Sequence, residues 1–113
     1  MLLAFFAATL AFANTPTEQV VGSWSNVWPG KGKAVMSFRS DGTFSASIYF
    51  DDGKVYSKGG TWKCEKNQIL YQYRDAEGNI TNTDIDQILS ITDDYLIIIA
   101  QDGAKRKYDK IKK

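Results

Sequence analysis

The residues that could do chemistry in this chain are mainly carboxylates and aromatics, because the sequence contains no histidine and a single cysteine. Without histidine, the Ser-His and Cys-His pairs that activate nucleophiles and the usual imidazole zinc sites cannot be assembled. Asp84 and Asp86 alternate along one predicted strand and could share a face, where close carboxylates would shift each other's pKa values. We expect this pair to point outward into solvent. The sequence therefore predicts no enzyme activity, no metal and no cofactor.

The other reactive groups have structural interpretations. Cys64 lies two residues after Trp62, so both should face the same side of a strand, and we expect the thiol to be buried and inert. Most of the remaining aspartates fall where turns are predicted, and we interpret them as turn formers: Asp41, Asp51, Asp52, Asp75, Asp93, Asp94 and Asp102.

The elements that must position these residues are strands. Helical periodicity is missing, whereas turn signals such as Asp41-Gly42, Asp52-Gly53 and Asp102-Gly103 recur along the chain. They delimit eight expected strands at about 19–28, 33–40, 43–50, 54–64, 68–74, 79–91, 95–101 and 104–112. Short connections join antiparallel neighbours, and closure removes the exposed edges of a meander. The predicted fold is an all-β, eight-stranded antiparallel up-and-down barrel.

The first 13 residues, "MLLAFFAATLAFA", are uncharged and end in the small-x-small pattern of a signal-peptidase site. We interpret residues 1–13 as a secretory signal and residues 14–113 as the barrel domain; the signal has no basic residue, for which a true start upstream and a wrongly assigned start are the two explanations. An apolar element of the fold or an uncleaved membrane anchor are the alternatives. The sequence thus predicts an exported protein, periplasmic or secreted, with no stable membrane span after cleavage.

The charge and the surface patterns limit the kinds of partner that the protein can have. The net charge is +1, and the basic residues of the tail at 104–113 alternate with Tyr108 and Ile111, as on the wet face of a terminal strand. We therefore expect no nucleic-acid partner. The stretch "YLIIIA" at 95–100 is apolar on both faces, so the N-terminal segment or another subunit would cover one of them. The expected state is a monomer or a weak dimer.

Three short motifs carry a family resemblance. They are Gly22-Ser23-Trp24 on the first strand, "DGTF" at 41–44 and "GTWK" at 60–63, with a late hairpin "ILSITDDYLII" at 88–98 as a further echo. In this order they resemble the lipocalin-like, calycin-type barrels, and most closely the small exported lipocalin-like domains of bacteria.

That resemblance implies roles for three residues. Trp24 would be the plug across the closed end of the barrel, and Arg106, with Lys107 as the alternative, would lie over its ring as a cation–π partner. The chain is much shorter than full-size lipocalins and shows no helix after the barrel. The resemblance therefore implies a shallow cup rather than a deep lipid calyx.

An eight-stranded barrel either fills with side chains or holds one small ligand. We hypothesise that the ligand is small and apolar and binds at the open end, contacting some of these residues: Trp28, Met36, Phe38, Ile48, Trp62, Tyr71 and Tyr73. Trp62 has the stronger interpretation as core, whereas Trp28 precedes a Pro-Gly-Lys-Gly-Lys loop at the mouth. The alternative function is a protein-interaction module, such as an inhibitor or envelope partner, acting through the barrel surface or the arm at 14–18.

Overall fold

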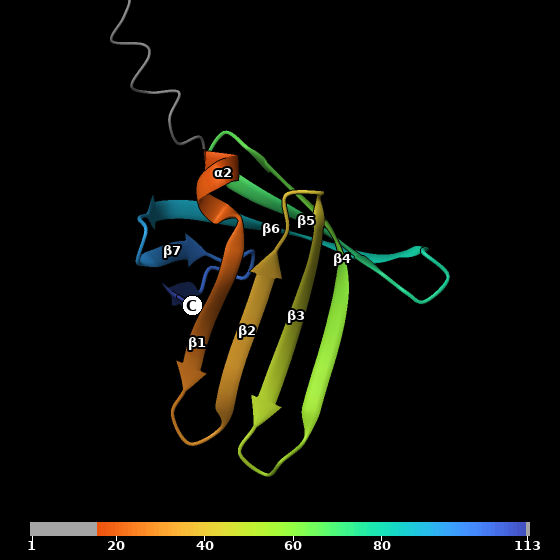
Figure 1. Ribbon diagram of the computed structural model, residues 1–113, viewed down its shortest axis with the longest axis vertical. Coiled ribbons are helices and arrows are strands. Elements are labelled where there is room, and N and C mark those ends of the chain that lie inside the picture. The colour runs from red at the N-terminus through yellow and green to blue at the C-terminus, as the bar shows by residue number, and fades with distance from the viewer. Residues whose placement is uncertain (1–15, 113) are drawn as a thin grey trace, which may run out of the picture.

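Eight antiparallel strands close into a barrel in the computed structural model, which describes residues 16–112 (Figure 1). Each strand is hydrogen-bonded to its neighbours in chain order, and the last returns to the first. The strands are β1 Gly22–Trp28, β2 Gly32–Phe38, β3 Thr43–Phe50, β4 Val55–Glu65, β5 Gln68–Arg74, β6 Ile80–Ile91, β7 Tyr95–Ile99 and β8 Lys105–Lys110. The predicted all-β meander barrel is confirmed.

The hairpin turns form where the aspartates predict them. In the β2–β3 turn, Gly42 takes a positive φ of 90°, which glycine adopts without steric cost. The backbone N–H of Thr43 donates to Asp41 Oδ1 at 2.9 Å, and the same two-residue pattern recurs at Asp52 and Asp102. Asp75 accepts two backbone N–H groups in the β5–β6 turn. The carboxylates therefore specify the turns rather than a reaction site.

A short helix, α2 (Pro16–Val20), precedes β1, where the sequence predicts a strand from residue 19 and a mobile arm at 14–18. Five residues are too few for an apolar period to be visible, although proline at the first position and Glu18 in the first turn suit a helix start. Val20 at its end is fully buried. Within residues 16–112 no helix is long and apolar enough to cross a membrane. The predicted signal at 1–13 lies outside the described residues.

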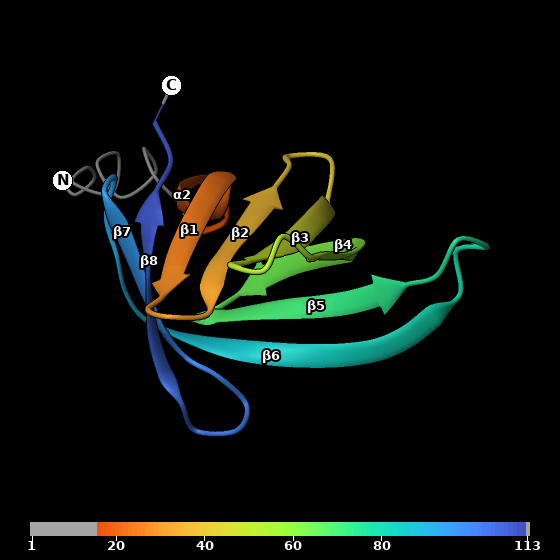
Figure 2. The same cartoon turned by 90° about the horizontal axis from the view of Figure 1, so that it is seen from below.

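The barrel wall has unequal height. β1 to β4 run well past the short strands β7 and β8 (Figure 1). The β5–β6 hairpin extends away from the barrel on the side opposite β7 and β8 (Figure 2). α2 lies at the other end, against β4 and β6. The barrel therefore has one end closed by the helix and one open end with a lip on the β1–β4 side.

The seam between β1 and β8 is the shortest pairing in the barrel. Its backbone register joins only Trp24 to Lys110 and Ser25 to Asp109 within the described chain, and the Asn26 side-chain amide donates to the Lys107 carbonyl at 2.7 Å. The Ile111 N–H adds a bond to the Ser23 carbonyl at 2.8 Å. Beyond Ser25 the two strands diverge.

Gly60 marks a close approach between strands, where the sequence predicts a bulge or bend at 59–60. The ladder is regular there, with Gly60 opposite Phe44 on one side and Tyr73 on the other. A Cβ on Gly60 would lie 1.9 Å from the Gln72 carbonyl oxygen. The irregularity lies instead in the β5–β6 pairing, between Tyr73 and Arg74. Glycine is required at position 60 by space rather than by a bulge.

Candidate ligand site inside the barrel

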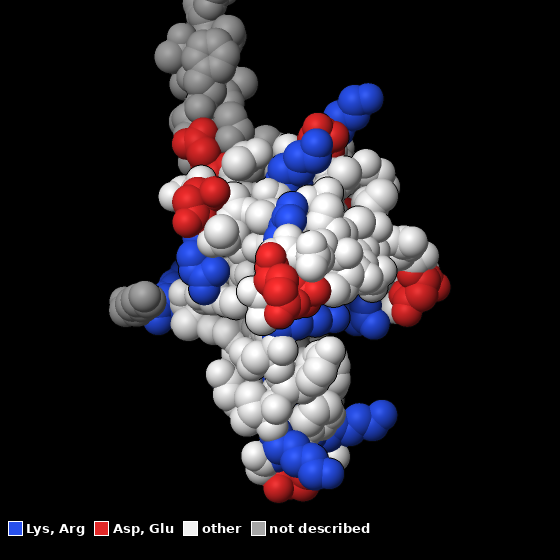
Figure 3. Space-filling view, turned by 90° about the vertical axis from the view of Figure 1, so that its right-hand side faces the viewer, with Lys and Arg blue, Asp and Glu red and all other residues white. Residues whose placement is uncertain are grey.

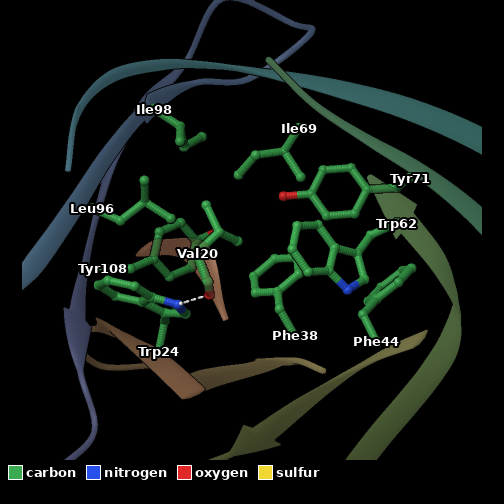
Figure 4. Packing of buried hydrophobic residues seen from close by; sticks show 10 residues of the cluster. All are labelled: Val20, Trp24, Phe38, Phe44, Trp62, Ile69, Tyr71, Leu96, Ile98 and Tyr108. Carbon is green, nitrogen blue, oxygen red and sulfur yellow. Dashed lines mark hydrogen bonds between the residues drawn. The ribbon is translucent and has the colours of Figure 1, made fainter. Parts of the chain in front are cut away.

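The closed end of the barrel is built around Trp24. Its side chain is 0% exposed, and the indole N–H donates to the Val20 carbonyl at 2.9 Å, which fixes the helix end against the plug (Figure 4). Lys110 Nζ lies 4.4 Å from the indole centroid and donates to the Val21 carbonyl at 2.8 Å. Trp24 thus has the plug position that the resemblance implies.

The cation over this plug is Lys110, so the predictions of Arg106 and of Lys107 are wrong. The register of the seam places Lys110 directly opposite Trp24, whereas Arg106 pairs with Ile98 two inward positions earlier along β8. Lys107 points to the other side of the strand, with Nζ 5.2 Å from the Tyr95 ring centroid. Basic residues occupy both faces of β8, and the register with β1 selects which one covers the indole.

A layer of aromatic rings fills the barrel above the plug. Phe38 is 1% exposed and lies at the centre, with its ring centroid 5.1 Å from that of Trp62 and 5.9 Å from that of Tyr71. Phe44 packs edge-on against Tyr71 at 5.3 Å. The Trp62 indole N–H donates to the Arg39 carbonyl at 2.9 Å. Figure 4 shows these rings packed together inside the barrel, so this half of the interior is solid.

A cavity of about 140 Å³ lies on the open side of this layer. Its wall combines aromatic rings, small side chains and charged groups from β2, β3, β5, β6, the end of β7 and β8: Met36, Phe44, Ala46, Tyr71, Tyr73, Asp84, Asp86, Ala100, Arg106 and Tyr108. Ala46 and Ala100 leave the space, because larger residues at these inward positions would fill it. The wall is more polar than the apolar interior that the sequence predicts.

The two carboxylates of β6 face this cavity, so the expectation that they point outward is wrong. Asp86 is 8% exposed, and its Oδ2 accepts the Tyr71 hydroxyl at 2.7 Å. The pairing of β5 with β6 sets Asp86 opposite Ile69 and Asp84 opposite Tyr71. Directly paired residues share a face of the sheet, and Ile69 and Tyr71 point inward. The carboxylates must therefore point inward as well.

Comparison with known proteins places this barrel in a family. The model of the lipocalin-like domain family matches residues 15–98. The chain belongs to the lipocalin-like domain family. No curated protein has significant sequence similarity to it.

Solved structures share the fold of this lipocalin-like domain. A lipocalin-like protein from Bacteroides uniformis superposes with a TM-score of 0.64 at 15% identity, covering 82% of this chain and 99% of that one. A protein from Bacteroides eggerthii gives 0.60 at 17%, covering 81% and 99%. A second Bacteroides uniformis protein gives 0.56 at 19%, covering 84% and 91%. At these identities the likeness establishes the fold.

The ligand-contact residues expected from the sequence separate into three places in the lipocalin-like domain. Met36, Tyr71 and Tyr73 line the cavity. Phe38 and Trp62 belong to the packed core. Two lie outside both sets: Ile48, a half-buried residue of β3, and Trp28, which lines a shallow groove where β1 and β8 diverge.

Seven cavity residues were missed as ligand contacts: the apolar Phe44, Ala46 and Ala100, and the polar Asp84, Asp86, Arg106 and Tyr108. Once Ile69 and Tyr71 are known to point inward, alternation along β5 identifies its other inward residues. Deciding which residues of β6 also point inward requires the register between the two strands. For β8, alternation groups Arg106 with Tyr108 and Lys110, and a single known contact of any one of them would have placed all three.

Burial raises the pKa of four groups that line the cavity: Asp86, Tyr71, Tyr73 and Tyr108. Desolvation raises the pKa of the Asp86 carboxyl, and the hydrogen bond from Tyr71 only partly opposes it. Burial and the charge of Asp86 raise the pKa of Tyr71 well above its ordinary value. The pKa of Tyr73 is raised to about 12, and that of Tyr108 is also raised, chiefly by burial. The three phenols are therefore neutral at physiological pH.

Cys64 is less buried than the sequence predicts. The thiol is half-buried between the barrel and α2, near Thr17. Burial raises the pKa of this thiol, with the Thr17 hydrogen bond as a smaller opposing effect. A raised pKa keeps the thiolate fraction low, so the geometry supports an unreactive cysteine.

We expect Asp86→Asn to stabilise the domain at neutral pH. The amide oxygen can still accept the Tyr71 hydroxyl, while the desolvation cost of a charge disappears. Because the pKa of Asp86 is raised on folding, the native state binds more protons than the unfolded state between the ordinary and the raised values. Wild-type stability therefore falls as the pH rises through that window, and the stability advantage of the variant grows.

Urea unfolding of both proteins from about pH 3 to about pH 8 measures this difference. Asp109→Asn, at an exposed position of β8, is the control and should show no comparable trend. A difference between Asp86→Asn and wild type that stays constant or shrinks with rising pH would contradict the prediction.

Proposed function

We propose that this lipocalin-like domain binds one small molecule in the cavity at the open end of the barrel. The observation that carries the proposal is the cavity itself, about 140 Å³ in volume, which lies above a solid aromatic layer. Its wall holds polar groups from separate strands, including a carboxylate that is 8% exposed. An apolar body with a few convergent polar groups is typical of ligand sites.

The volume limits the ligand. A cavity of about 150 Å³ accommodates benzene, whereas sites for drug-sized molecules measure about 300–1,000 Å³. The part of the ligand inside the barrel is therefore about one ring or a short chain. A long acyl chain does not fit between the aromatic layer and the mouth, which agrees with the shallow cup implied by the short sequence.

Binding rather than catalysis is proposed for two reasons. The sequence has no histidine, and Cys64, the one thiol, lies outside the lining of the cavity. The described residues also contain no cluster of three acidic or sulfur-bearing side chains able to hold a metal ion. We further propose that residues 1–13 direct export, so that the domain meets its ligand in the periplasm or outside the cell.

A titration with single-ring probes tests the proposal. Benzyl alcohol and its charged analogues, added to the purified protein, should give saturable heats or chemical-shift changes with a Kd of about 10 µM to 1 mM. Native mass spectrometry of freshly purified protein should also detect a small co-purifying mass.

Cavity filling supplies the matched control. Ala46→Leu adds three carbons at a lining position, whereas Ser47→Leu makes a comparable change at the next residue, on the opposite face of β3. We expect Ala46→Leu to abolish probe binding and Ser47→Leu to retain it. Absence of binding to wild type, or equal loss in both variants, would overturn the cavity as the functional site.

A second function, binding of a protein partner, is favoured by the protruding β3–β4 hairpin. Its large apolar side chains are exposed at Tyr49, Phe50, Val55 and Tyr56. The extended part of this hairpin shows mostly uncharged surface until the charged tip (Figure 3). Exposed apolar clusters of this kind mark interaction sites, and this function gains weight if no probe binds in the barrel.

A further inference from the structure

The wall of the cavity offers hydrogen-bond acceptors and ring faces. Asp84 and Asp86 bring two carboxylates, while Tyr71, Tyr73 and Tyr108 bring three phenol rings. Arg106 is the one basic residue among the lining residues, so the ionised wall has a net negative charge. A ligand that carries a positive charge complements this wall.

Arg106 does not remove that preference, because it lies at the rim. Its side chain is 37% exposed, and its guanidinium Nη2 is 4.0 Å from Asp102 Oδ2 outside the cavity. The same residue also lines the two shallow grooves beside the mouth. Solvent and Asp102 share its charge with Asp86, so Arg106 offsets only part of the negative charge of the wall.

One ring of the cavity already contacts a cation. Lys58 Nζ lies 4.1 Å from the centroid of Tyr73, although Lys58 is itself exposed. Tyr73 is stacked on Tyr71 at 6.3 Å with an interplanar angle of 7°. The face of a phenol ring attracts ammonium groups through its quadrupole, and more strongly where water is excluded. Lys58 thus shows that a phenol ring of this wall pairs with an ammonium group, although the face of Tyr73 that it covers is already occupied.

The Tyr108 hydroxyl lacks a hydrogen-bond partner among the described residues. Tyr108 is 7% exposed, and no described residue forms a hydrogen bond with its hydroxyl. Within the described chain every fully buried side-chain nitrogen or oxygen has a partner, so this hydroxyl must reach the open space of the cavity that Tyr108 lines. Buried polar groups are normally hydrogen-bonded, which points to a ligand atom at this place.

We infer that the ligand is a small organic cation, with an ammonium group carried on a single ring or a short apolar chain. The inference rests on the proposed function and names its ligand class. The ammonium N–H groups donate to the carboxylates of Asp84 and Asp86 and to the Tyr108 hydroxyl oxygen. The apolar part packs against Met36 and Phe44.

Calorimetric titration of the full chain with three probes of matched size tests the inference. Benzylammonium carries the cation, benzyl alcohol is its neutral counterpart and benzoate is the anion. At about pH 7.5 and low salt, we expect benzylammonium to bind at least about 10-fold more tightly than benzyl alcohol, with benzoate the weakest. Asp84→Asn and Asp86→Asn should each weaken benzylammonium about 5- to 30-fold and change benzyl alcohol less than about 3-fold.

The exposed carboxylate variant Asp109→Asn is the control and should leave all three affinities unchanged. Tighter binding of benzyl alcohol or benzoate than of benzylammonium would overturn the cation inference and leave the cavity as a ligand site. Equal weakening of benzylammonium and benzyl alcohol in the aspartate variants would assign the carboxylates a structural role and overturn it as well. If no probe binds, the proposed function itself fails.

Discussion

Trp24→Ala is expected to lower the free energy of unfolding by about 3–5 kcal/mol, the range for removing a buried aromatic side chain. The loss has three sources at one place. A fully buried indole leaves a cavity, the Val20 carbonyl loses its donor, and Lys110 loses the ring beneath its ammonium group. Since domains of this size are stable by about 5–15 kcal/mol, the variant should unfold at much lower urea concentration.

Trp28→Ala provides the matched comparison, on the same strand and the same side of it. Trp28 is half-buried and lines only the shallow groove beside the seam, so its loss should cost no more than about 1 kcal/mol. Urea unfolding followed by circular dichroism measures both. Similar losses at the two positions would contradict the role of Trp24 as the plug of the closed end.

Gly60→Ala is expected to destabilise the barrel by more than about 3 kcal/mol, or to prevent folding. The new Cβ would lie 1.9 Å from the Gln72 carbonyl oxygen, and backbone atoms cannot move aside as a flexible side chain can. β4 and β5 would have to separate at the ladder that holds Tyr73 beside the cavity. In an ordinary strand the same change would stabilise by about 0.5–1 kcal/mol, so the sign itself is diagnostic.

Gly59→Ala tests the same prediction with a milder clash. Its Cβ would lie 2.9 Å from the Phe44 carbonyl oxygen, a milder clash on the neighbouring ladder. We expect a smaller loss of stability than in Gly60→Ala, with amide exchange accelerated along β3–β4 rather than β4–β5. An equal or reversed order would show that the spacing of these strands is not what requires glycine.

The strands of this fold could be predicted because each hairpin has its own local signal. Asp41-Gly42 and its repeats fix the turns by a side-chain hydrogen bond and a positive φ, and both belong to adjacent residues. Alternation then gives the two faces of each strand. α2 could not be predicted in this way, because its five residues are stabilised by packing of Val20 on the barrel rather than by their own periodicity.

The site was less predictable because it depends on register between strands. Asp86 belongs to the interior only because it pairs with Ile69, and Lys110 covers Trp24 only because β8 meets β1 at that residue. A shift of one residue in either pairing would reverse the face. An aspartate side chain is usually exposed to solvent. Here the register between β5 and β6 places Asp86 inside the barrel, and the sequence of β6 alone does not determine that register.

The short seam between β1 and β8 gives this molecule an order of assembly. Every other pairing joins strands that are neighbours in the chain and closes a small loop, whereas Trp24 and Lys110 come from opposite ends of the domain. Contacts distant in sequence carry the larger loop-closure entropy and slow folding. Seven hairpins can form as the chain emerges, but the plug is covered only when the last strand arrives. Because so few backbone bonds hold this seam, we expect the barrel to open there first when it unfolds.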